Sequence, residues 1–148
     1  MDFVEVANNE KLDYLDLLLT ADEQKDMILK YLYRGKMFAL YDHDLKAVSV
    51  ITKEDDEIFE IKNIAVVPKY YKLGYGTKIM EHILNFYKDL GSVIYVGTGS
   101  SKQTLSFYTK CEFTYSHVVK NFFIDNYNLP IFEEGKQLID MIYLKRNL

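Results

Sequence analysis

The stretch Asn63-Ile-Ala-Val-Val-Pro-Lys-Tyr-Tyr-Lys-Leu-Gly-Tyr-Gly-Thr-Lys78 leads from an apolar strand through a short loop to two glycines at the start of an amphipathic helix. The first four N–H groups of a helix have no partner within it, and the helix dipole places positive charge at that end, which favours phosphate binding. Gly74 and Gly76 lack a Cβ, so a ligand can approach the backbone closely. The stretch therefore predicts a cradle for a phosphate group.

The helix that follows is predicted by its apolar residues, which recur at helical spacing: Ile79, Met80, Ile83, Leu84 and Tyr87. Gly91 stands where a C-terminal cap is expected. A lone Gly-x-Gly is a weak motif, so the alternative is a strand, turn and helix whose glycines serve only packing.

The residues Val66-x-Pro68-x-Tyr70-Tyr71-Lys72-Leu73-Gly74-Tyr75-Gly76 resemble the acyl-CoA signature of the GNAT superfamily of N-acetyltransferases. Two positions depart from the family pattern: Tyr71 replaces Gln or Arg, and Lys72 stands where a glycine is common. The resemblance implies acetyl-CoA as co-substrate and no metal. The residues that it implies in acetyl-CoA binding are Ile64, Ala65, Val66, Tyr71, Lys72, Leu73, Gly74, Tyr75, Gly76, Thr77, Ser101 and Lys110.

A second stretch, Phe107-Tyr-Thr-Lys-Cys-Glu-Phe113, resembles another GNAT signature, in which an aromatic pair precedes a turn. Glu112 replaces the usual glycine, so a differently shaped turn is expected. Tyr108 stays in register with the signature. Its alternative role is that of one core aromatic among 13 tyrosines.

The composition of the chain indicates a single globular domain over residues 1–148, with 49% hydrophobic residues and no linker-like stretch. No apolar run reaches the length of a membrane span, and no signal peptide is visible, so we expect a cytoplasmic protein. The net charge of -4 argues against a nucleic-acid partner. A lone cysteine, Cys111, excludes an internal disulfide and is expected to be buried. The sequence leaves a homodimer open.

The first part of the chain predicts a strand at Phe3–Val6, a helix capped by Asn8 or Asn9, and a second helix that begins with the capping box Thr20-Ala-Asp-Glu23 and ends at Gly35. An antiparallel meander follows, with strands at 37–41, 47–52 and 57–66. The third strand changes register, which predicts a bulge or splay near Asn63. Acidic turns separate the strands; a metal site there is disfavoured, because charged hairpin tips are usually solvated.

The last part predicts a strand at Ser92–Val96, a helix at Lys102–Lys110 capped by Ser100 or Ser101, and final strands at 114–120 and 137–144 around a long aromatic loop. Together with the meander, this order predicts an α+β fold with α-β-α layers: a GNAT-like mixed, mostly antiparallel sheet with helices on both faces. In the GNAT fold the strand that ends at Val66 parts from its neighbour, and the acyl-CoA arm pairs with the free groups of Ile64, Ala65 and Val66.

The resemblance implies an N-acetyltransferase that moves an acetyl group from acetyl-CoA to a primary amine of a small molecule or peptide, by direct attack in a ternary complex. The Val66 N–H would hold the oxyanion, and Tyr108 would protonate the thiolate. Glu60, assisted by Asn63, would accept the amine proton; the alternative is that Glu60 is an exposed strand residue paired with Lys62. Two other functions stay open: a non-catalytic acyl-CoA-binding sensor and a phosphate-binding interaction module.

Overall fold

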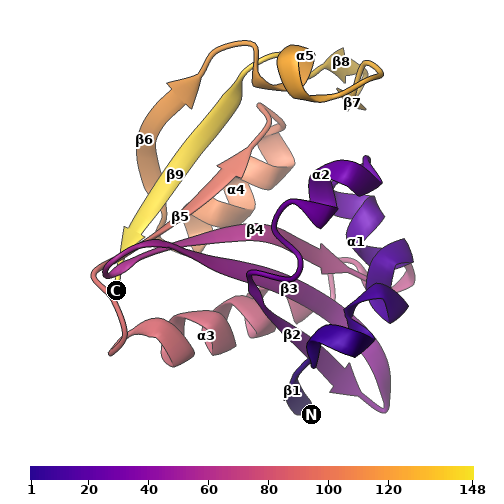
Figure 1. The fold of residues 1–148 in the computed structure, drawn as a ribbon, viewed down its shortest axis with the longest axis vertical. Helices are drawn as coiled ribbons and strands as arrows, with labels where there is room; N and C mark the ends of the chain where they lie inside the picture. Colours follow the sequence, from indigo (N-terminus) through magenta and orange to yellow (C-terminus); the bar gives the residue numbers. More distant parts are fainter.

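A seven-stranded sheet forms the centre of the protein, in the order β1-β2-β3-β4-β5-β9-β6, in a computed structural model that describes residues 1–148 (Figure 1). The strands are β1 (Asp2–Glu5), β2 (Lys36–Asp42), β3 (Asp44–Asp55), β4 (Ile58–Val66), β5 (Val93–Thr98), β6 (Thr114–Val119) and β9 (Met141–Asn147). Only β4 and β5 run parallel; every other neighbouring pair is antiparallel. The predicted mixed, mostly antiparallel sheet is confirmed.

Helices cover both faces of this sheet (Figure 1). One face carries the 3-10 helix Asn8–Tyr14 with α1 (Leu15–Ala21) and α2 (Lys25–Leu29); the other carries α3 (Tyr75–Tyr87) and α4 (Lys102–Lys110). The segment between β6 and β9 holds α5 (Phe122–Asn126) and a small hairpin of β7 (Phe132–Glu133) and β8 (Lys136–Gln137). None of the helices has the length and apolar character that crossing a membrane requires.

Two hydrophobic cores result, one on each face, and the central strands contribute to both. Along β2, Met37 and Ala39 pack with α1 and α2, whereas Phe38 and Leu40 pack with α3. Successive strand residues point to opposite faces, so a strand covered on both sides is apolar throughout. This explains why β2 and β3 carry continuous buried runs rather than an alternation.

The predicted irregularity near Asn63 is a β-bulge. In the β3–β4 register Val50 pairs with Asn63 and Ile51 with Ile61, so Lys62 is an extra residue. Before the bulge, Ile61 packs in the α3 core; after it, Ala65 packs in the α1–α2 core. The bulge therefore leaves Lys62 and Asn63 on the face that α1 and α2 cover.

The strands β4 and β5 part beyond the bulge, as expected. Their pairing begins at Ile58 with Val93 and stops at Ile61 with Val96. Beyond that point β5 pairs with β9 alone, and β4 pairs with β3 alone. We call the opening beyond Ile61 and Val96 the β4–β5 gap.

The predicted helix starts were wrong in the first part of the chain. Ala7 precedes the 3-10 helix, and neither Asn8 nor Asn9 caps it. The capping box at 20–23 does not form, because the Thr20 hydroxyl donates to the Leu17 carbonyl at 2.7 Å and α2 begins only after Gln24. Within the predicted capping box, the Asp22 side chain instead binds residues that are distant in the sequence, as described below.

Two other boundaries differ from the prediction. The helix α3 ends at Tyr87, so Gly91 is not its cap; a Cβ at Gly91 would lie 2.5 Å from the Phe59 ring, and close packing on β4 explains the glycine. The last strand, expected at 137–144, is β9 at Met141–Asn147, and Gln137 belongs to the separate β8.

Candidate functional site

The cradle predicted from the sequence begins at Gly74, which precedes the first residue of α3. Its φ of +91° is left-handed, a conformation that glycine adopts without strain. A Cβ there would meet nothing within 4 Å. The glycine is thus required by the backbone turn, and the space in front of this helix end is open.

Gly76 has a packing role, which was the alternative proposed from the sequence. It lies in the first turn of α3, where a Cβ would be 3.2 Å from the Phe107 ring and 3.6 Å from Val66 Cγ2. Its missing side chain lets α4 pack closely on α3. This contact supports the packing alternative for Gly76, and its part in the phosphate cradle stays a prediction.

The loop before Gly74 is exposed. Tyr71 and Leu73 are 54% and 65% exposed. Lys72 has a φ of +65°, so it holds the left-handed conformation that a glycine would favour at this position. Tyr75 is instead tied back to the sheet, because its hydroxyl donates to Asp42 at 2.9 Å.

Thr77 and Lys110, two further residues implied in cofactor binding, line one hollow of about 480 Å³ between α3, the end of α4 and the C-terminus. Ser101 lies elsewhere, at the start of α4. Its hydroxyl accepts the Thr104 N–H at 3.4 Å and donates to Glu134 at 3.1 Å. The predicted cap is confirmed at Ser101, and this hydroxyl already has protein partners.

The edge of β4 that faces the β4–β5 gap presents free backbone groups. The Val67 N–H donates to the Lys46 carbonyl at 2.8 Å, toward β3. Because backbone groups alternate along an antiparallel pair, those of Ala65 also point to β3, and those of Ile64 and Val66 point into the gap. Of the three residues predicted to have free backbone groups, only Ile64 and Val66 have groups that point into the gap.

Tyr108 lies on the α3–α4 side of the sheet and is buried. Its ring packs between Phe107 and Phe113, with centroids 5.2 Å and 5.9 Å away. Burial raises the pKa of Tyr108 well above its ordinary value, so the phenol is protonated at neutral pH. In the following turn Glu112 takes a left-handed φ of +67°, a conformation that a glycine would favour at this position.

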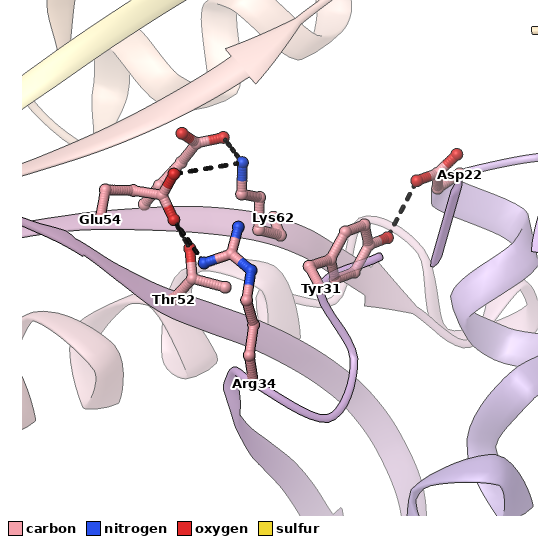
Figure 2. A network of polar contacts seen from close by, with 7 residues as sticks. Asp22, Tyr31, Arg34, Thr52, Glu54 and Lys62 are labelled. Atoms are coloured by element: carbon pink, nitrogen blue, oxygen red, sulfur yellow. Dashed lines mark hydrogen bonds and ion pairs between the residues drawn. The ribbon is translucent and has the colours of Figure 1, made fainter. Parts of the chain in front are cut away.

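Glu60 lies on the other face of the sheet and is not exposed, contrary to the alternative proposed from the sequence. Its side chain is 12% exposed and pairs with Lys62 at 2.8 Å. Burial raises the pKa of Glu60, although the Lys62 ammonium opposes that shift. Figure 2 shows how Lys62 and Arg34 both reach Glu54, at 3.8 Å and 2.8 Å.

Asn63 is brought to the same face as Glu60 by the bulge and is 4% exposed. Its Nδ2 donates to the Leu18 carbonyl at 3.0 Å and to the Tyr31 hydroxyl at 3.1 Å. Tyr31 in turn donates to Asp22 at 2.9 Å, as Figure 2 shows.

Asp22 is the residue of this network that the sequence did not reveal. It also accepts a hydrogen bond from Tyr127 at 2.7 Å, a residue 105 positions away. Burial raises the pKa of Asp22, and the two tyrosine hydroxyls partly oppose the shift. No local pattern indicates this role, because it depends on a contact with a residue far away in the sequence.

The arrangement places one possible proton acceptor and one possible proton donor on opposite faces of the gap, and a free strand edge leads from it to the open helix end at Gly74. Within the chain, no group of three or more His, Cys, Asp and Glu side chains is arranged to hold a metal ion.

Comparison with known proteins agrees with this geometry. A family model described as an acetyltransferase (GNAT) domain matches residues 33–115. The chain is 36% identical over 148 residues to the uncharacterized N-acetyltransferase YvbK of Bacillus subtilis (strain 168), with 98% of this chain and 96% of that protein covered.

Two solved structures are also similar. One is a GNAT family acetyltransferase from Elizabethkingia anophelis with acetyl-CoA bound, with 34% identity, a TM-score of 0.92, and 99% and 97% of the two chains covered. The other is a Bacillus subtilis acetyltransferase in complex with CoA, with 36% identity, a TM-score of 0.87, and again 99% and 97% covered.

Proposed function

The chain belongs to the GNAT acetyltransferase family, and we propose that this enzyme transfers the acetyl group of acetyl-CoA to a primary amine of a small molecule or peptide, by direct attack of the amine on the thioester. The β4–β5 gap carries this proposal. A strand-like arm can pair with its free edge at Ile64 and Val66, while a diphosphate reaches the N-terminus of α3 at Gly74.

The two faces of the gap support a ternary complex. The amine would enter from the α1–α2 face, where Glu60 lies, and the thiolate would leave beside Tyr108 on the α3–α4 side. Attack forms the C–N bond, and collapse of the tetrahedral intermediate breaks the C–S bond. Neither carboxylate nor phenol needs to bond covalently to the acetyl group.

Three groups would handle the charge of this reaction. The Val66 N–H, which points into the gap, would donate to the oxyanion. Glu60, through water and with Asn63 nearby, would take the proton from the amine, and its raised pKa makes it a stronger base than an ordinary glutamate. Tyr108 would donate its proton to the thiolate and regain one from solvent.

The test is release of free thiol from acetyl-CoA with a panel of polyamines, amino sugars and peptides. Amine-dependent thiol release, with mass spectrometry of an acetylated product, is the expected result. Calorimetry with acetyl-CoA alone is the companion measurement. Tight acetyl-CoA binding without thiol release for any amine would contradict the enzyme and support an acyl-CoA sensor.

A further inference from the structure

A chain of hydrogen bonds joins the bulge of β4 to the C-terminal loop. It begins at Asn63, passes through Tyr31 to Asp22, and ends at Tyr127, with donor–acceptor distances of 3.1, 2.9 and 2.7 Å. Gln24 adds two contacts to the same loop: its Nε2 donates to the Asn126 carbonyl at 3.4 Å, and its Oε1 accepts the Asn128 N–H at 2.8 Å. None of these contacts is required by the chemistry described above.

The chain fixes which way the Asn63 amide points. The Leu18 carbonyl can only accept a hydrogen bond, so the atom of Asn63 beside it, at 3.0 Å, must be the nitrogen. The Tyr31 hydroxyl gives its own proton to Asp22 and therefore also accepts from Asn63. Both N–H groups of the amide are used, and Oδ1 is left over.

This Oδ1 is the one buried side-chain polar atom of the protein without a hydrogen-bond partner. A buried polar atom without a partner costs about 1–3 kcal/mol, and each such atom calls for an explanation. Asn63 stands two residues beyond the last β4–β5 pair, on the face that also carries Glu60. A buried acceptor atom without a protein donor thus belongs to a residue just beyond the point where the gap opens.

We propose that Asn63 Oδ1 accepts a hydrogen bond from an N–H group of a bound substrate, with Tyr31 and Asp22 as positioning residues that hold the amide in this orientation. Two substrate groups share the required chemistry: the amine of the acceptor and the amides of the pantetheine arm. The face on which Asn63 lies favours the acceptor amine. This inference rests on the proposed function, because it takes both substrates from it.

The test compares Asn63→Ala with the wild type in three measurements: KM for an accepted amine, Kd for acetyl-CoA and thermal stability. We expect KM for the amine to rise about tenfold or more while Kd for acetyl-CoA stays within about twofold, because one hydrogen bond donated by the amine to a buried acceptor is lost. A rise in Kd for acetyl-CoA of similar size would instead identify the pantetheine amide as the donor. If neither constant changes, Oδ1 does not contact a substrate, and the proposal is wrong.

Ser49→Ala is the matched control, because the Ser49 hydroxyl donates to the backbone carbonyl of Asn63 at 2.7 Å and is equally buried. It should lower the melting temperature and leave both constants unchanged. Tyr31→Phe tests the positioning role: it should raise the same constant as Asn63→Ala, by a smaller factor. An unchanged constant in a folded Tyr31→Phe variant would overturn that role.

Failure of the proposed function has a separate signature. A wild-type protein that acetylates no amine contradicts the function itself. A wild-type protein that turns over, and whose Asn63→Ala variant has both constants unchanged, contradicts only this inference.

Discussion

Replacing Gly74 with glutamate should weaken phosphate binding without disrupting the fold. Gly74 has a φ of +91° and open space around its missing Cβ, so a side chain there meets no protein atom within 4 Å. The only structural cost is the left-handed backbone, about 1–2 kcal/mol for a residue with a Cβ. Gly74→Ala carries the same cost, so these two variants should have similar free energies of unfolding.

The binding cost comes from the added charge. A carboxylate about 4 Å from a phosphate is repelled by about 1 kcal/mol in bulk water and by about 4 kcal/mol at the effective dielectric constant typical near a protein surface. These limits correspond to an increase in Kd between about fivefold and about a thousandfold. Because the helix end is open to solvent, we expect about tenfold to a hundredfold for Gly74→Glu relative to Gly74→Ala.

Titration calorimetry with acetyl-CoA at low and high salt measures this difference, which should shrink as salt screens the repulsion. Gly135→Glu is the matched control: Gly135 has a φ of +76°, nothing within 4 Å of its missing Cβ, and a place in the β7–β8 turn. The Gly135→Glu variant should lose about as much stability as Gly74→Glu and should keep the wild-type affinity for acetyl-CoA. A folded Gly74→Glu variant that binds acetyl-CoA as tightly as Gly74→Ala would refute the cradle.

Three further predictions concern single side chains. Tyr108→Phe keeps the ring packing and deletes the proton donor, so kcat should fall about 10²-fold with acetyl-CoA affinity nearly intact; steady-state turnover equal to that of the wild type would exclude Tyr108 as the acid. Burial raises the folded-state pKa of Asp22, so the folded protein holds this proton more tightly and stability is lost as pH rises from about 4 through the raised pKa. The melting temperature of Asp22→Asn relative to wild type should therefore increase between pH 4 and 8, and a constant difference would contradict the burial argument. Glu112→Gly and Glu112→Ala both lose the exposed contact with Arg146, but only Glu112→Gly relieves the left-handed φ of +67°. Calorimetry should therefore give Glu112→Gly a melting temperature about 2 °C above that of the wild type, and Glu112→Ala should show no such rise.

The sequence predicted those parts of the fold that follow from local pattern. A break in the alternation along the third meander strand indicated the bulge near Asn63. The parting of this strand from its neighbour was implied by the family resemblance, and the structure agrees with it. The left-handed turn at Gly74 was likewise a local requirement. The site residues implied by the family resemblance stay predictions, as do the cytoplasmic location and the homodimer.

What the sequence did not predict depends on contacts between distant residues. Asp22 looked like part of a helix cap, yet its carboxylate binds Tyr31 and Tyr127. The packing partner of Gly76 was not predictable from the local sequence, because the ring that it contacts belongs to Phe107 in another helix. The alternative role for Glu60 assumed an exposed side chain. Its burial comes from the tertiary structure, which the local pattern does not show.

The β4–β5 gap should make the stability of the protein depend on the concentration of its ligand. Only four residue pairs, from Ile58–Val93 to Ile61–Val96, join the β1–β4 part of the sheet to the part formed by β5, β9 and β6. A ligand that fills the remaining edge acts as a temporary strand, and at a hundred times its Kd it adds about 2.7 kcal/mol to the free energy of unfolding. Proteases that cut the transiently opened chain would then degrade it fastest when acetyl-CoA is scarce. The same missing backbone pairs would then make the lifetime of the folded protein depend on how much acetyl-CoA is available.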